Sequence, residues 1–221
     1  MTTAFPEALL VRLRKSGVVA GFSVESAAQA VPLCRALLAG GIDTIELTLR
    51  SAAGMDGVKA IAAELPEIVL GVGTILTPEQ AREVKAAGAT FGVAPGMNPR
   101  VVRAAAEAGL PFAPGVATPS DLEAAIELGC RLVKFFPAEP VGGINYLRSM
   151  SAPYKHLGIQ YFPLGGLNDT NMLEYLNEPN VPTIGGSWIV KPELVAKADW
   201  AGITARASSV VQLLKQRKAH E

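Results

Sequence analysis

The sequence predicts an α/β protein, namely a (β/α)8 barrel of the TIM type with an extra helix ahead of its first strand. Four segments pass from an amphipathic stretch through glycine into an apolar run in nearly the same way, at 38–42, 86–89, 107–110 and 127–130. Glycine closes a helix because it accepts the left-handed backbone conformation. The repeat therefore indicates helices and strands in alternation.

Eight apolar runs, spaced by roughly 20–28 residues, fit the length of one strand plus one helix. They begin near Val18, Ile42, Ile68, Ala89, Leu110, Arg131, Ile159 and Pro182. Eight such units suggest the barrel. An open, doubly wound sheet is the alternative, and it would use about five to seven units. No linker or shift in composition divides the 221 residues, so we expect one domain over 1–221.

The segment Thr2–Lys15 is predicted to form the extra helix. Apolar residues that fit one helical face are Phe5, Leu9, Leu10 and Leu13. We do not expect a secretory signal here, because the basic residues follow the apolar stretch instead of preceding it. The charged tail, residues 215–221, is expected to be a frayed and solvated helix end.

The composition argues against several classes of protein. Hydrophobic residues make up 49% of the chain and charged residues 18%, which is typical of a folded core and not of a disordered chain. Twenty basic residues balance 20 acidic ones, so no basic excess exists to hold nucleic acid or an anionic membrane. We expect a cytoplasmic protein with neither nucleic acid nor a membrane as partner.

The cysteines and histidines do not predict a metal site. Cys34 and Cys130 lack CxxC spacing, and we interpret them as small buried residues in a reducing compartment. His156 and His220 lack the spacing of metal ligands. A metal-dependent enzyme would need clustered histidines or carboxylates, so we expect no metal.

Lys134 lies inside an apolar run, 132–137, that reads as a buried strand. A buried ammonium ion without a partner is costly, and a lysine in such a place tends to lose its proton and become a nucleophilic amine. Schiff-base enzymes use that amine to attack a ketone. Phe136 shares its strand face and would form an apolar wall of the same cavity, whereas Phe135 would pack outward. A lysine with a buried stem and a solvated head is the alternative.

The predicted second strand carries further polar side chains to the carboxyl end of the barrel, where barrel enzymes place their chemistry. Strand periodicity puts Thr44, Glu46, Thr48 and Arg50 on one face, which would point into the barrel. A carboxylate and a guanidinium would thus lie inside. An internal Glu46–Arg50 ion pair that only fills space is the alternative.

The ends of other predicted strands are rich in glycine. Thr74 follows Gly71 and Gly73, and we expect its hydroxyl at the rim, beside glycines that permit close approach of a ligand. The last two strands end in the pairs 165–166 and 185–186, the second followed by Ser187. Barrels often bind phosphate with these two loops through backbone N–H groups. Two pairs in these loops favour a phosphate site over simple turns.

Six segments carry these residues: IELTLR (45–50), GVGT (71–74), APG (94–96), VKFFPAE (133–139), PLGGLN (163–168) and IGGSW (184–188). In order and spacing they resemble the class I 2-keto-3-deoxy-6-phosphogluconate/4-hydroxy-2-oxoglutarate aldolases, over nearly the whole chain. The resemblance implies a homotrimeric (β/α)8 barrel that uses no metal and no organic cofactor. It implies cleavage of the first compound to pyruvate and glyceraldehyde 3-phosphate, and of the second to pyruvate and glyoxylate.

The resemblance also implies roles for individual residues. Lys134 would form a Schiff base with the C2 carbonyl of pyruvate, and Glu46 would carry protons, through a water molecule. Arg50 and Thr74 would hold the carboxylate of the 2-keto acid, with Pro95 nearby. The residues that would line the pocket or receive the distal phosphate are Phe136, Gly165, Gly166, Gly186 and Ser187.

Two positions depart from the family. Leu164 stands where threonine is frequent in these aldolases, near C4 of the substrate, and leucine cannot donate a hydrogen bond to the C4 hydroxyl. The first strand, 17–22, lacks the basic residue that many relatives carry at its end. Cleavage of the 4-epimeric galactonate compound therefore stays open.

Two further classes are alternatives. One is a phosphate-binding barrel that acts as an isomerase or synthase and has no need of a nucleophilic lysine. The other is a ligand-binding relative without catalysis. Retention of Lys134, Glu46 and Arg50 argues against the second, because an unused set of buried charges tends to destabilise a protein.

Overall fold

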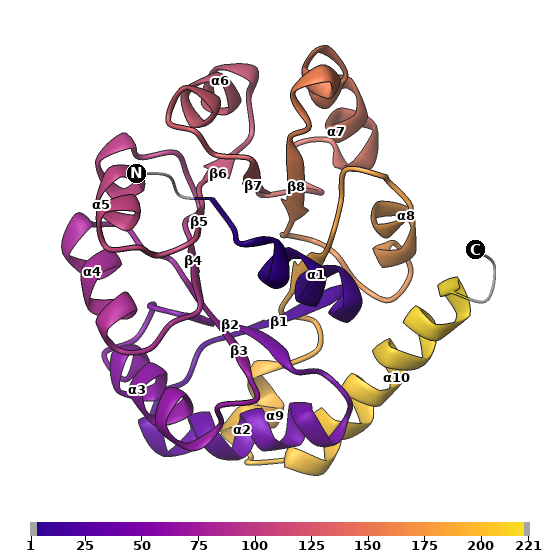
Figure 1. The fold of residues 1–221 in the computed structure, drawn as a ribbon. Helices are drawn as coiled ribbons and strands as arrows, with labels where there is room; N and C mark the ends of the chain where they lie inside the picture. The colour runs from indigo at the N-terminus through magenta and orange to yellow at the C-terminus, as the bar shows by residue number, and fades with distance from the viewer. Residues whose placement is uncertain (1–3, 219–221) are drawn as a thin grey trace.

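The strands form two parallel sheets that follow one another around the molecule (Figure 1). A computed structural model describes residues 4–218 of the chain, and the side chains of residues 4–216. One sheet has six strands in the order β5-β4-β3-β2-β1-β9, and the other has three in the order β6-β7-β8. The strands are β1 (Val18–Phe22), β2 (Thr44–Thr48), β3 (Val69–Gly73), β4 (Phe91–Val93), β5 (Phe112–Ala113), β6 (Gly115–Val116), β7 (Leu132–Phe135), β8 (Gln160–Pro163) and β9 (Ile184–Gly186).

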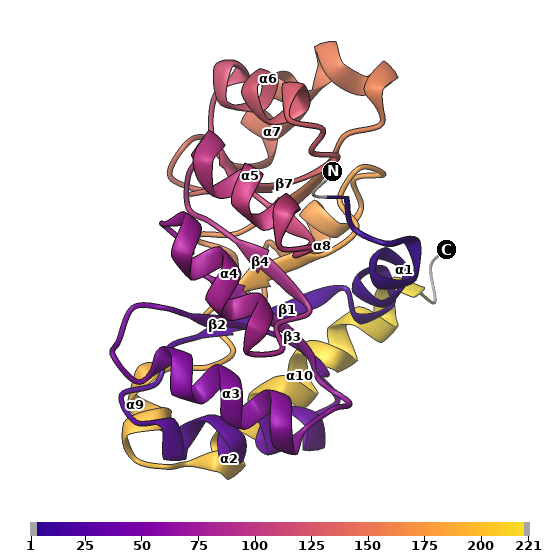
Figure 2. The same cartoon turned by 60° about the vertical axis from the view of Figure 1, so that its left-hand side comes forward.

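The helices surround the strands, except that α1 lies in the middle of the view in Figure 1. They are α1 (Glu7–Ser16), α2 (Ala27–Ala39), α3 (Gly54–Glu64), α4 (Pro78–Ala86), α5 (Pro99–Glu107), α6 (Pro119–Glu127), α7 (Gly143–Ser151), the 3-10 helix η1 (Ala152–Leu157), α8 (Met172–Leu176), α9 (Pro192–Ala196) and α10 (Trp200–Lys218). Figure 2 shows α2, α3, α4 and α5 stacked along one flank, in chain order. The predicted alternation of strand and helix is confirmed.

Each predicted strand start lies within two residues of an observed one, from Val18 in β1 to Ile184 in β9. The fifth predicted strand is interrupted, because Pro114 separates β5 from β6. Proline has no N–H to donate to a ladder, so a strand breaks where it is inserted. The Lys134 N–H of β7 nevertheless donates to the Pro114 carbonyl at 2.9 Å, which joins the two sheets.

The ladders do not close a ring within residues 4–218: none joins β5 to β6, and none joins β8 to β9. β1 lies between β2 and β9, so the first and last strands pair with each other. An open, doubly wound sheet is not expected to pair its first and last strands. The structure thus establishes a curled, parallel α/β arrangement.

The inner core is an apolar cluster enclosed by the strands. It contains Phe91 of β4, Phe162 of β8 and Leu164, with Phe5, Leu9 and Leu13 added from the N-terminal segment. A larger cluster, which includes Ile45 and Leu47, lies between the strands and the outer helices. Helix α1 covers the interior at the end remote from the strands' carboxyl termini (Figure 1).

The N-terminal helix was predicted to start too early. Thr2 lies outside the described residues, and α1 begins only after Pro6, at Glu7. The residue before a proline is pushed out of the helical region, whereas the proline itself is tolerated at a helix start. At the other end α10 continues to Lys218, so the first residues of the tail are helical, and His220 lies outside the described part.

Both cysteines are buried, as predicted, and no disulfide joins them. Burial raises the pKa of the Cys34 thiol to about 12. Within residues 4–218 no helix is long and apolar enough to cross a membrane.

Candidate active site

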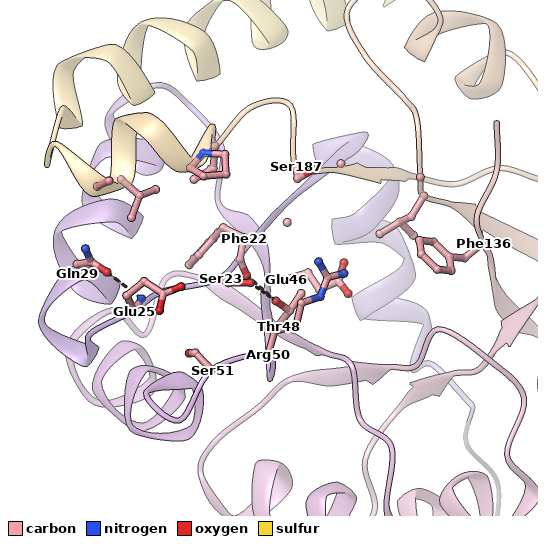
Figure 3. A pocket seen from close by; sticks show the side chains of 18 of the residues that line it. Phe22, Ser23, Glu25, Gln29, Glu46, Thr48, Arg50, Ser51, Phe136 and Ser187 are labelled. Atoms are coloured by element: carbon pink, nitrogen blue, oxygen red, sulfur yellow. Dashed lines mark hydrogen bonds between the residues drawn. The ribbon is translucent and has the colours of Figure 1, made fainter. Parts of the chain in front are cut away.

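A pocket of about 530 Å³ opens at the carboxyl ends of β1, β2, β7, β8 and β9 (Figure 3). Strands of both sheets therefore contribute to it. The predicted residues that line it are Glu46, Arg50, Lys134, Phe136, Leu164, Gly165, Gly186 and Ser187. The structure thus brings together side chains that are up to 141 positions apart in the sequence, from Glu46 to Ser187 (187 − 46).

Lys134 and Glu46 form a buried pair at the inner end of this pocket. Lys134 Nζ lies 2.9 Å from Glu46 Oε1, and the two side chains are 7% and 2% exposed. The Phe136 ring covers the amine, with its centroid 5.1 Å from Nζ. Phe135 points the other way and stacks on Tyr146, as the strand pattern predicted. A solvated lysine head is thereby excluded, and the amine is held where a small ketone could reach it.

Gly73 makes room for the Glu46 side chain, whereas a side chain on Gly21 would only touch it. A Cβ on Gly73 would lie 2.0 Å from Glu46 Oε1 and 2.7 Å from its carboxyl carbon. A Cβ on Gly21, in the neighbouring strand, would lie 3.6 Å from Glu46 Oε2. Gly73 was expected to let a ligand approach, but the space above it is filled by the carboxylate. Its role is thus to position Glu46 against Lys134.

Replacing Gly73 with alanine should therefore displace Glu46 and disrupt the pair with Lys134. A contact of 2.0 Å cannot be accommodated without moving the carboxylate, and a misplacement of about 1 Å can reduce turnover by roughly 10²-fold. The measurement is kcat for cleavage of a 2-keto-3-deoxy acid, with Gly96→Ala as control because nothing lies within 4 Å of a Cβ there. Equal kcat in the two variants would contradict this role of Gly73.

Arg50 follows β2, and Figure 3 shows its guanidinium extending into the pocket. Within the described residues its guanidinium makes no hydrogen bond and no ion pair, and the buried pair of Glu46 is with Lys134. The alternative of an internal Glu46–Arg50 pair is wrong. A free guanidinium that lines the same pocket as the amine is suited to bind a carboxylate bidentately.

The two glycine loops present free donors. Gly165 and Gly166 have φ angles of +98° and +86°, which favour glycine. The backbone N–H groups of Gly165, Gly166 and Ser187 donate to no acceptor among residues 4–218. Three such donors at the ends of β8 and β9 can bind an anion.

Side chains from three segments hold these loops in place. Trp188 Nε1 donates to Asp169 Oδ1 at 2.7 Å, which ties the loop after β9 to the loop after β8. Arg206 of α10 donates to the carbonyl oxygens of Trp188 and Ile189. A Cβ on Gly186 would lie 1.9 Å from the Trp188 ring, so glycine is required for this packing as well.

Three predicted residues do not line the pocket: Thr74, Pro95 and Gly166. Thr74 follows β3 in a left-handed conformation, with φ of 62°, which is uncommon for a β-branched residue and is found most often at functional sites. Pro95 is half-buried, and Gly166 is exposed beside Glu139. Their roles stay predictions.

Sequence reasoning missed Ser23, which lies at the carboxyl end of β1 and lines the pocket. Its oxygen is 2.6 Å from Thr48 Oγ1. The signal was present, because Ser23 is the first polar residue after an apolar strand. Among the described residues no cluster of three or more His, Cys, Asp and Glu side chains could hold a metal ion.

Comparison with known proteins points to one family. The family model described as KDPG and KHG aldolase matches residues 10–206. A 2-dehydro-3-deoxy-phosphogluconate aldolase of Treponema pallidum is 39% identical over 91% of this chain and 95% of its own length.

Two solved structures have the same fold. The KDPG aldolase of Legionella pneumophila, with pyruvate captured as a covalent carbinolamine intermediate, has a TM-score of 0.87 and 34% identity, and the match covers 93% of this chain and 98% of that one. The enzyme of Zymomonas mobilis, with 3-phosphoglycerate, has a TM-score of 0.84 and 33% identity, over 91% and 94% of the two chains.

Proposed function

The chain belongs to the KDPG and KHG aldolase family, and we propose that it cleaves 2-keto-3-deoxy-6-phosphogluconate to pyruvate and glyceraldehyde 3-phosphate through a Schiff base on Lys134. The enzymes of this family are lyases. One observation above all supports the proposal: the Lys134 amine is buried, lies 2.9 Å from the Glu46 carboxylate and opens onto a pocket. The relatives' names give the substrate, and the pocket provides the amine that the chemistry needs.

In the first half of the reaction, the neutral amine attacks the C2 ketone, and loss of water gives a protonated imine. Glu46 then accepts the proton of the C4 hydroxyl. The C3–C4 bond breaks, its electron pair flows into the iminium to form an enamine, and the aldehyde leaves. In the second half, Glu46 returns a proton to C3, and water hydrolyses the imine to release pyruvate and the free amine. One carboxylate can perform both transfers because they occur in turn.

The binding roles follow from the free donors of the pocket. Arg50 holds the carboxylate of the 2-keto acid and so orients C2 toward Lys134. Thr74 and Pro95 assist at the same end, and Phe136 excludes water from the imine. The phosphate binds at the two glycine loops, which contribute Gly165, Gly166, Gly186 and Ser187, and the N–H groups of Gly165, Gly166 and Ser187 are free to donate to it.

We propose a single domain over 1–221 in which the two sheets are arcs of one (β/α)8 barrel. β5 and β6 count as one strand broken by Pro114, and β8 packs against β9, where a Cβ on Gly185 would meet Leu164 and Phe162. We also propose a cytoplasmic homotrimer without metal or organic cofactor, and without nucleic acid or a membrane as partner. Sedimentation equilibrium tests the trimer.

The other substrates stay possible because of Leu164. It lines the pocket, is 6% exposed and packs in the inner core, so it presents only methyl groups to the substrate. The family description includes 4-hydroxy-2-oxoglutarate, and the 4-epimeric 6-phosphogalactonate compound differs only in the C4 hydroxyl.

Leu164→Thr is expected to increase the discrimination between substrates that differ in configuration at C4. The new hydroxyl can bond one orientation of the C4 hydroxyl better than the other, and a hydrogen bond of this kind changes relative rates by roughly three- to tenfold. The measurement is kcat/KM for both C4 epimers and for 4-hydroxy-2-oxoglutarate. If the relative rates of the three substrates do not change, Leu164 does not determine the preference for one configuration at C4.

Trapping of the imine tests the proposed function. The protein is incubated with pyruvate, reduced with borohydride and digested, and the adduct is located by peptide mass. We expect one adduct, on Lys134. An isomerase or synthase would give none, and absence of an adduct on every lysine would falsify the aldolase mechanism.

A further inference from the structure

The pocket extends beyond the parts that the proposed reaction uses. In Figure 3, Ser23, Glu25, Gln29 and Ser51 lie on the side away from Phe136. These side chains come from the loop after β1, the first turns of α2 and the loop after β2. We call the group formed by Ser23, Glu25 and Ser51 the outer wall. None of its members has a role in imine formation or in the glycine loops.

The hydroxyl proton of Ser23 is used in a hydrogen bond to Thr48. Thr48 Oγ1 donates to the Phe22 carbonyl at 3.2 Å, and a carbonyl oxygen can only accept. A hydroxyl has one proton, so in the 2.6 Å contact between Ser23 and Thr48 both bonds form only if Ser23 donates. Ser23 Oγ then has lone pairs but no proton to offer to the pocket.

The Ser51 hydroxyl also uses its proton within the protein, since it donates to the Val24 carbonyl at 2.5 Å. Glu25 is exposed, contributes a carboxylate and forms no ion pair within residues 4–216. The side chains of the outer wall therefore offer hydrogen-bond acceptors only. Behind it, Gln29 Oε1 accepts the N–H groups of Glu25 and Ser26, which leaves the Gln29 amide as one neutral donor.

Such a surface discriminates between two kinds of group. A phosphate or carboxylate at neutral pH brings acceptors and negative charge, so it would face lone pairs and the Glu25 carboxylate. A hydroxyl group can donate to Ser23 or Ser51 and accept from Gln29. The cationic side chain that lines the pocket besides Lys134 is Arg50, and it is required by the carboxylate of the keto acid. The chemistry of the wall thus matches an uncharged, hydroxylated chain.

We infer that the outer wall is a subsite for the hydroxyl groups of an unphosphorylated 2-keto-3-deoxy sugar acid, which this chain would cleave in addition to a phosphorylated substrate. The inference rests on the proposed function, because it needs the same imine on Lys134. It assigns Ser23 and Ser51 as acceptors that select hydroxyl groups, and Glu25 as the residue that disfavours an anion on this side of the pocket.

The test compares kcat/KM for the unphosphorylated and the 6-phosphorylated 2-keto-3-deoxygluconate, with the ratio of the two as the readout. Ser23→Ala and Ser51→Ala should each lower the unphosphorylated-to-phosphorylated ratio roughly fivefold, since each removes one hydrogen-bond acceptor. Glu25→Gln should lower it about two- to fivefold, mainly by raising kcat/KM for the phosphorylated compound. Matched controls are Ser209→Ala and Glu83→Gln, which are exposed on α10 and α4 and should keep the ratio.

The outcomes separate the two proposals. In one outcome, pyruvate traps Lys134 in every variant, and the ratio stays at the wild-type value in Ser23→Ala, Ser51→Ala and Glu25→Gln. The outer wall is then not a hydroxyl subsite, and the aldolase assignment stands. Failure of the wild type to cleave the unphosphorylated acid at all would also overturn the subsite. If pyruvate traps no lysine, the proposed function falls and the subsite falls with it.

Discussion

Replacing Lys134 with methionine is expected to reduce kcat/KM for aldol cleavage by roughly 10⁴-fold or more, because Lys134 is the one amine among the described residues that line the pocket. Methionine has a similar length and fits the apolar surroundings of Phe136. The measurement is the rate of pyruvate release, followed by a coupled reaction that reduces the pyruvate by hydride transfer. Borohydride trapping with pyruvate should give no adduct at position 134 in the variant.

The same substitution should destabilise the protein. Glu46 is 1% exposed and accepts a hydrogen bond from Lys134, so removing the amine leaves a buried carboxylate without this partner. Breaking a buried pair from one side costs about 3–5 kcal/mol. The free energy of unfolding is measured in urea. The double variant Lys134→Met/Glu46→Leu should recover most of that loss, since it leaves neither charge unpaired.

A surface lysine provides the control. Lys191 lies 4.0 Å from Glu193 with both side chains about half-exposed, so Lys191→Met should change the unfolding free energy by less than about 1 kcal/mol and should still allow trapping. If Lys134→Met retained adduct formation or substantial cleavage, the nucleophile would have to be another lysine. If the double variant were less stable than Lys134→Met, the pair would not act as a unit.

Some of this site could be predicted because strand periodicity is strict. Alternation along β2 was sufficient to place Glu46 and Thr48 inside and Ile45 and Leu47 outside, and the structure confirms that placement. The same rule separated Lys134 from Phe135. Residues far apart in sequence converge because parallel strands bring their carboxyl ends to one edge.

Other features depend on contacts that periodicity does not contain. Gly73 was read as an opening for a ligand, but its lack of a side chain accommodates Glu46 from a neighbouring strand. Predicting that the fifth strand is interrupted at Pro114 would have required knowing which N–H groups take part in the ladder. Ser23 received no role because its significance lies in the direction of one proton, which is set by the Phe22 carbonyl and Thr48.

Glu46→Gln is expected to separate imine formation from proton transfer. The glutamine carbonyl can still accept the hydrogen bond from Lys134 that the structure shows at 2.9 Å, so the amine stays positioned and the adduct with pyruvate should still form. An amide cannot accept and return a proton, so kcat for cleavage should fall by about 10²–10⁴-fold. The same transfer controls exchange of the pyruvate C3 protons with solvent.

Proton NMR of pyruvate in deuterated water measures that exchange without any cleavage step. The wild type should exchange the methyl protons, Glu46→Gln should exchange them at least about 10²-fold more slowly, and Glu46→Asp should lie between, because it keeps a carboxylate at a greater distance from C3. Borohydride trapping on the same samples shows whether the imine has formed. If Glu46→Gln forms the adduct and exchanges protons as fast as the wild type, another group moves the proton and Glu46 serves only to hold Lys134 in place.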